Sequence, residues 1–94
     1  MADPVRFHRV MGFTRSEFLR LLPLLELSPR DGRSHAGPLG RGEVTLRMGE
    51  QGERRLGSFV LPELPVELEF RDCEEGEVEA FLRRFDRVYQ RGGG

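Results

Sequence analysis

Hydrophobic and polar residues alternate along this chain with two different periods, and the period separates predicted strands from predicted helices. Hydrophobic residues at 44, 46 and 48 alternate with polar residues at 45 and 47, which predicts a strand with one buried and one solvated face. Similar patterns predict strands at residues 5–10, 54–61 and 66–71. The Pro-Glu-Leu-Pro sequence at 62–65 predicts a turn between the last two strands.

Two segments show the three- and four-residue spacing of amphipathic helices. The first begins at Thr14, which is spaced from Glu17 as in a capping box. Pro23 lacks a backbone donor, so we expect this helix to end or kink near Leu22. The second has acidic residues at its start and arginines in its second half, which complements the helix dipole. Its apolar face consists of Val78, Phe81, Leu82, Phe85, Val88 and Tyr89.

These elements predict the order β-α-β-β-β-α in a single α+β domain spanning residues 1–94. The expected architecture is an antiparallel sheet of about four strands with two helices packed on one face. Residues 28–42 are rich in Gly, Pro, Ser and Arg, and they predict a long flexible loop. Gly92 is the expected helix stop, and residues 92–94 form a predicted frayed tail.

Composition changes how the charged residues are interpreted. Lys, Ile and Asn are absent, and because their codons are rich in A and T, a GC-rich bacterial genome explains why all 15 basic residues are Arg. We therefore give arginine enrichment little weight as a sign of phosphate binding. The chain has no long apolar run, no pattern of a secretion signal and a single cysteine, which together predict a cytoplasmic protein with no membrane span.

Residues 14–91 share their α-β-β-β-α order with the double-stranded RNA-binding domain. That family binds phosphates with basic residues at the start of its second helix. The same place here reads Glu74-Glu75-Gly76-Glu77, which would repel a phosphate backbone. With a formal net charge of −1 as well, the sequence argues against nucleic-acid binding.

Candidate catalytic and metal-binding residues are few. Cys73 lies at the start of the last helix, where the dipole favours a thiolate, but Asp72, Glu74 and Glu75 disfavour a second negative charge. The histidines at 8 and 35 do not have the spacing of a metal site. We therefore predict no catalytic residues, no metal and no cofactor, and lean against an enzyme.

The strongest sign of a partner is the run Phe59-Val60-Leu61. Because strand side chains alternate between faces, at least one of these residues points away from the helices. Either a neighbouring segment covers that side chain, or it belongs to a patch that contacts another chain. We regard Phe59 and Leu61 as candidate interface residues.

Two functional hypotheses follow. The first is a non-enzymatic accessory or protein-interaction domain. Its partner would be either a second copy of the same chain, giving a homodimer, or a different protein. The second is a small-ligand or anion-binding protein in which residues 28–42 form a lid. Its anion-binding residues would be Arg30, Arg33, His35 and Arg41.

Overall fold

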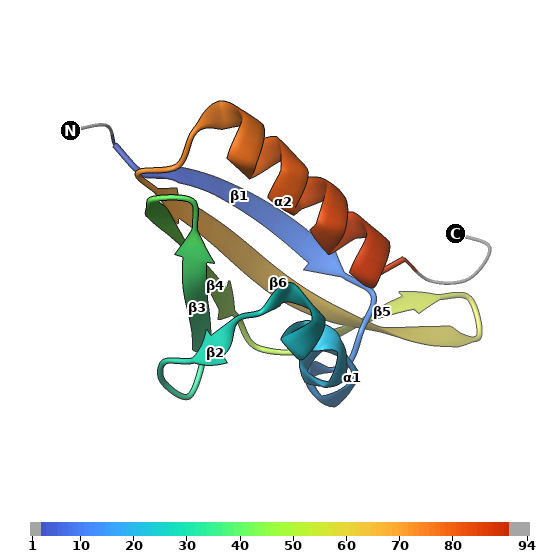
Figure 1. Cartoon of the computed structure of the whole chain (residues 1–94). Coiled ribbons are helices and arrows are strands. Elements are labelled where there is room, and N and C mark those ends of the chain that lie inside the picture. Colours follow the sequence, from blue (N-terminus) through green and yellow to red (C-terminus); the bar gives the residue numbers. More distant parts are fainter. Residues whose placement is uncertain (1–2, 91–94) are drawn as a thin grey trace.

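The computed structural model describes residues 3–90 and shows a small α+β domain with six antiparallel strands and two α-helices (Figure 1). The predicted tail at residues 92–94 and the stop at Gly92 lie outside the described residues. The strands are β1 (Val5–Met11), β2 (Ser28–Pro29), β3 (Ser34–Leu39), β4 (Gly42–Met48), β5 (Gly52–Leu56) and β6 (Phe59–Arg71). The helices are α1 (Arg15–Leu21), the 3₁₀ segment η1 (Leu22–Leu25) and α2 (Glu75–Val88).

Strand β6 is the centre of the sheet, whose order is β1-β6-β4-β3-β2. The second half of β6 pairs with β1 from Val5↔Phe70 to Met11↔Leu64, and with β4 on its other side. The first half of β6 pairs with β5 alone. The β5–β6 hairpin, residues 52–63, therefore projects beyond the body of the sheet (Figure 1).

The first helix begins and ends as its sequence predicts. The Thr14 hydroxyl accepts a hydrogen bond from the Glu17 backbone N–H at 3.1 Å, and the Glu17 carboxylate accepts one from Thr14 N–H at 2.9 Å. This confirms the capping box. The α-helix ends at Leu21, and Pro23 lies in the 3₁₀ turn that follows, as the missing proline donor requires.

The core lies between one face of the sheet and the helices. In α2, Phe81 packs edge-to-face on Phe70 of β6 with ring centroids 5.6 Å apart. Tyr89, directly after α2, stacks on Phe18 of α1 at 4.2 Å and donates a hydrogen bond to the Phe18 carbonyl at 2.9 Å. The eight large, fully buried side chains come from all three helical segments and from the sheet: Phe18, Leu22, Val44, Leu46, Leu64, Leu68, Phe70 and Phe85.

The expectation of a flexible loop at 28–42 was wrong, which is one reason the sheet has six strands instead of about four. Strand β3 pairs with β4 over six residue pairs. The turn before β3 is closed by the Asp31 carboxylate, which accepts hydrogen bonds from the backbone N–H groups of Arg33 and Ser34. At Gly37 a Cβ atom would lie 2.8 Å from the Glu26 carbonyl. Small residues here permit close backbone packing, so their presence does not indicate flexibility.

The predicted boundaries of the next two strands were also wrong. Residues 54–61 are not one strand, because Gly57 adopts a φ of +61° and the chain reverses at Gly57-Ser58. No turn occurs at 62–65, since β6 runs through both prolines. Pro62 lies opposite Glu53, three pairs from the turn-closing pair Leu56↔Phe59. Hydrogen-bonded and non-hydrogen-bonded pairs alternate, so the missing N–H of Pro62 faces the open edge and leaves no β5 carbonyl unpaired. Pro65 lies at the β4–β5 break, and its carbonyl accepts Gly49 N–H at 2.8 Å.

Candidate functional site

The sheet face opposite the helices carries a connected group of charged side chains around Glu69. This carboxylate is only 5% exposed and accepts hydrogen bonds from Arg6 Nε at 3.0 Å and Arg71 Nε at 2.8 Å. Burial raises the pKa of Glu69, but the hydrogen bonds from Arg71 and Arg6 outweigh burial, so the net pKa lies below its ordinary value. A general acid near neutral pH needs the opposite shift. Glu69 is therefore suited to anchoring the two arginines and not to proton transfer.

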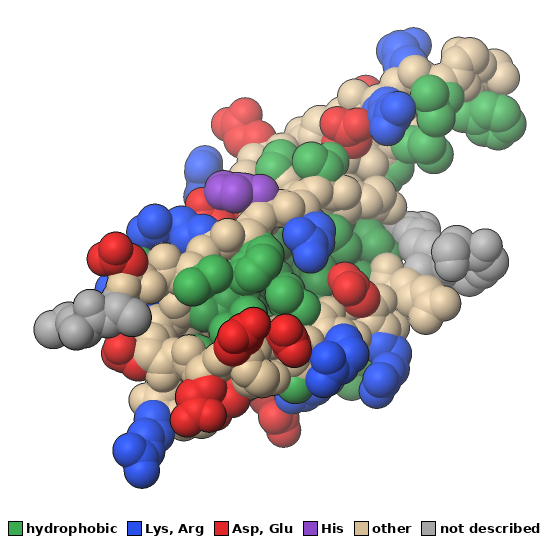
Figure 2. Space-filling model, turned by 90° about the horizontal axis from the view of Figure 1, so that it is seen from above, with side chains coloured by type: hydrophobic (Ala, Val, Ile, Leu, Met, Phe, Trp, Pro, Cys, Tyr) green, Lys and Arg blue, Asp and Glu red, His purple; other side chains and the backbone are tan. Residues whose placement is uncertain are grey.

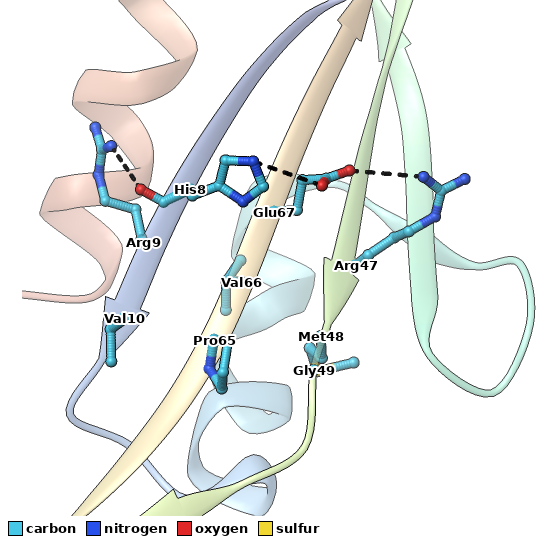
Figure 3. A pocket seen from close by; sticks show the side chains of 9 residues that line it. All are labelled: His8, Arg9, Val10, Arg47, Met48, Gly49, Pro65, Val66 and Glu67. Carbon is cyan, nitrogen blue, oxygen red and sulfur yellow. Dashed lines mark hydrogen bonds and ion pairs between the residues drawn. The ribbon is translucent and has the colours of Figure 1, made fainter.

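The same face has a shallow hollow of about 410 Å³ (Figure 3). Glu67 lies between His8 and Arg47, with oxygens 3.7 Å from His8 Nε2 and 3.7 Å from Arg47 Nη1. The His8 side chain is exposed and points outward from the strand. Below this row the hollow is lined by Val10, Pro65 and Gly49. None of the described residues that line it is Ser, Thr or Cys, so the hollow has no hydroxyl or thiol nucleophile.

Cys73 is half-buried and held by backbone carbonyl groups. Its thiol lies 3.3 Å from the Arg71 carbonyl oxygen and 3.7 Å from those of Leu39 and Glu43. Burial raises the pKa of Cys73, and the carboxylates of Glu77 and Asp72 raise it further. Because the thiolate is the nucleophile, this environment disfavours reactivity.

The structure separates Arg41 from the other residues of the proposed anion-binding lid, because Arg30, Arg33 and His35 flank the turn between β2 and β3. Arg30 forms an ion pair with Glu43, while Arg41 lines a hollow together with Asp72, Glu74 and Glu77. His35 and Arg41 lie toward opposite ends of β3, a six-residue strand about 20 Å long at the usual rise per residue. Burial and the charge of Arg15 lower the pKa of His35, which favours its neutral form. Arg41 therefore lies apart from His35, and Arg30 is already engaged by Glu43.

The part of the chain that the structure describes shows neither a cluster of potential metal ligands nor a helix that could span a membrane. Among residues 3–90, no three His, Cys, Asp or Glu side chains cluster as potential ligands of a metal ion. No described helix has the length and apolar character needed to cross a bilayer.

The β5–β6 hairpin carries the largest concentration of exposed hydrophobic side chains. Phe59 is 70% exposed, and Leu56, Val60 and Leu61 are between 43% and 47% exposed. Residues opposite one another in an antiparallel pair share a face, so Leu56 and Phe59 lie on the same face as Leu61. Val60 lies on the other face, which makes the end of the hairpin apolar on both sides. We call Leu56, Phe59, Val60 and Leu61 the hairpin patch.

The patch continues onto the body of the sheet. Val10 is 67% exposed, and with Leu61 and Arg54 it lines a hollow of about 200 Å³ at the base of the hairpin. Sequence reasoning identified Phe59 and Leu61 but missed Val10 and Leu56. Reading Gly57-Ser58 as a two-residue turn would have placed Leu56 opposite Phe59. Val10 joins the patch only through the pairing of β1 with β6, which has no local signal.

Comparison with protein-family models, with curated proteins and with solved structures found no significant match. The function is therefore inferred from the geometry of this chain.

Proposed function

We propose that this protein is a non-enzymatic protein-interaction domain that self-associates through the β5–β6 hairpin. The observation that carries the proposal is the hairpin patch, in which four hydrophobic side chains lie exposed on a projecting two-stranded ribbon. A ribbon of this kind has no core of its own and is marginally stable in water. Contact with another chain would both bury the hairpin patch and stabilise the ribbon.

The size of the exposed side chains supports a binding role. Phe59 is the most exposed large hydrophobic residue among those described. Fully burying such a side chain contributes about 1.5–3 kcal/mol, and aromatic anchors of this kind commonly dominate interface energies. Arg54 and Arg55 on β5 add positive charge beside the patch. An apolar centre with a charged border is the usual arrangement of an interface.

The anion-binding alternative receives less support. It needs Arg30, Arg33, His35 and Arg41 to converge around one ligand. Instead, Arg30 is paired with Glu43, and Arg41 lies among carboxylates. Residues 34–39, within the expected lid, form a strand integrated in the sheet, so opening them would break the β3–β4 pairing.

Sedimentation equilibrium across a wide concentration range tests the proposal. We expect the wild-type protein to dimerise and Phe59→Asp to weaken dimerisation at least about tenfold, because the change removes the apolar anchor and places a charge in the interface. Leu24→Asp is the matched control, since Leu24 is also a large exposed hydrophobic residue but lies on η1. A wild-type protein that remains monomeric throughout, or equal effects of the two substitutions, would contradict the proposal.

A further inference from the structure

A second apolar surface lies between β1 and α2, and it forms a groove of about 510 Å³. This volume lies within the range of sites that bind apolar groups. Figure 2 shows hydrophobic side chains gathered on this side of the molecule with acidic side chains beside them. We call it the β1–α2 groove; its hydrophobic lining is Val5, Phe7, Val78 and Leu82.

The groove lies beside an open sheet edge. Strand β1 is the last strand on its side of the sheet, and no other strand of residues 3–90 pairs with its outer edge. Backbone N–H and C=O groups on such an edge are available to an added strand. An edge strand next to a helix-lined apolar groove is an arrangement that accepts an extended segment, with the backbone bound by the edge and side chains by the groove.

The hairpin has an open edge as well. β5 follows β4 after only three residues, 49–51, too few for the chain to cross β6, so β5 pairs on the β4 side. The other edge of residues 59–63 lies on the β1 side of β6. Because β1 pairs with β6 only as far as Leu64, this edge of the hairpin is open. Both the hairpin and the groove therefore offer unpaired backbone beside apolar side chains.

Charge identifies the hairpin as a suitable occupant of the groove. Glu75 and Glu79 line the groove. In the hairpin, Arg54 and Arg55 lie toward the turn, whereas its two acidic residues, Glu53 and Glu63, lie at the base. Within residues 3–90 none of the two groove glutamates and two hairpin arginines takes part in an ion pair. The two surfaces are thus apolar at their centres and opposite in charge at their borders, which favours their association.

The hairpin cannot occupy the groove of its own chain. Val5, at the groove, is opposite Phe70, whereas the hairpin turn precedes Phe59 on the same strand. Eleven residues of extended β6 separate these points, or about 36 Å at the usual rise. Figure 2 shows the hairpin projecting away from the central hydrophobic area. The occupant must come from a second molecule.

We propose that the β5–β6 hairpin of one copy docks into the β1–α2 groove of a second copy, and that the second hairpin docks reciprocally into the first groove. This inference rests on the proposed function and names its partner surface. Each copy has one hairpin and one groove, so a twofold arrangement satisfies both and closes at two subunits. The dimer buries the hairpin patch and covers the open edge of β1.

A charge-exchange experiment tests the arrangement. One variant carries Arg54→Glu and Arg55→Glu, and a second carries Glu75→Arg and Glu79→Arg. In a homodimer of either variant, both hairpin–groove contacts bring like charges together. We therefore expect the dimerisation of each variant alone to weaken at least about tenfold. Mixed in equal amounts, they restore opposite charges at both contacts, and we expect a heterodimer within about threefold of wild-type affinity. Native mass spectrometry resolves the three dimers because the variants differ in mass.

The outcomes separate this inference from the broader proposal. If Phe59→Asp abolishes the dimer while the Glu75→Arg, Glu79→Arg variant dimerises normally, the hairpin is the interface but the groove is not its site, which overturns the inference alone. If Phe59→Asp has no effect, both fail. Failure of the mixture to form heterodimer, or assemblies larger than two, would also overturn it. Arg20→Glu with Arg87→Glu is the control for the same change in net charge as the hairpin variant, because both residues are exposed and neither lies in the hairpin or lines the groove, and we expect it to dimerise like the wild type.

Discussion

The contact between Tyr89 and Phe18 offers a quantitative test of how the two helices are held together. Tyr89 is 5% exposed, and its hydroxyl donates a buried hydrogen bond to the Phe18 carbonyl at 2.9 Å. Its ring is nearly parallel to that of Phe18, with centroids 4.2 Å apart and planes at 6°. Burial raises the pKa of the hydroxyl far above neutrality, so it remains a donor across the usual pH range. Tyr89→Phe removes this donor and leaves the aromatic contacts in place.

The expected loss in the free energy of unfolding follows from what each substitution removes. In Tyr89→Phe the apolar ring area is retained, and the main loss is one buried hydrogen bond with its carbonyl left unsatisfied, which costs about 1–2 kcal/mol. Tyr89→Ala also removes ring contacts with Phe13, Phe18 and Phe85, and large aromatic truncations cost about 3–5 kcal/mol. The difference between the two variants separates the hydrogen bond from the packing.

Urea denaturation followed by far-ultraviolet circular dichroism measures both free energies of unfolding. We expect Tyr89→Phe to lower the midpoint with an unchanged m-value, and to lower the melting temperature by about 4–8 °C per kcal/mol in a domain of this size. Unchanged or increased stability of Tyr89→Phe would show that the Phe18 carbonyl has another partner. A Tyr89→Ala variant no less stable than Tyr89→Phe would refute the stacked geometry.

Three further predictions concern other parts of the fold. Glu69→Gln should lower stability at neutral pH by about 1–3 kcal/mol. Because the pKa of folded Glu69 lies below the ordinary value of 4.5, its ionised form stabilises the fold above that value, and the difference between wild type and variant should shrink as pH falls below it in acid-titrated melts. Cys73 should react with iodoacetamide at neutral pH more slowly than free cysteine, and Glu77→Gln should accelerate it; rapid labelling of the folded wild type would contradict the raised pKa. Gly42→Ala should cost about 1–3 kcal/mol in urea titrations, because its Cβ would lie 2.0 Å from a backbone carbonyl oxygen, whereas Gly52→Ala, with nothing within 4 Å, should change stability by less than about 0.5 kcal/mol; equal costs would contradict the close approach.

Local chemistry determined the elements that depend on neighbouring residues. The Thr14–Glu17 capping box and Pro23 specify where α1 begins and ends, because both act on backbone groups within one turn. The apolar face of α2 follows from spacing alone, and the structure buries Val78, Phe81, Phe85 and Tyr89 from it. Alternation likewise located β1 and β4, because a half-buried strand repeats every two residues wherever it lies in a sheet.

Tertiary pairing decided the rest. Residues 28–42 have the composition of a loop, but Ser34 and Ala36 are buried where β3 lies beside β4, and no local pattern encodes that partner. Continuation of β6 through Pro62 and Pro65 depends on which strands end beside those positions.

The candidate interaction surfaces show the same division. The Phe59-Val60-Leu61 run was visible in the sequence, because three consecutive hydrophobic residues on a strand must direct at least one side chain to the face away from the helices. Its projection from the sheet depends on β1 ending opposite Leu64, and the β1–α2 groove joins segments nearly seventy residues apart. A one-dimensional pattern records which side chains are apolar; the packing of distant segments determines which of them remain uncovered.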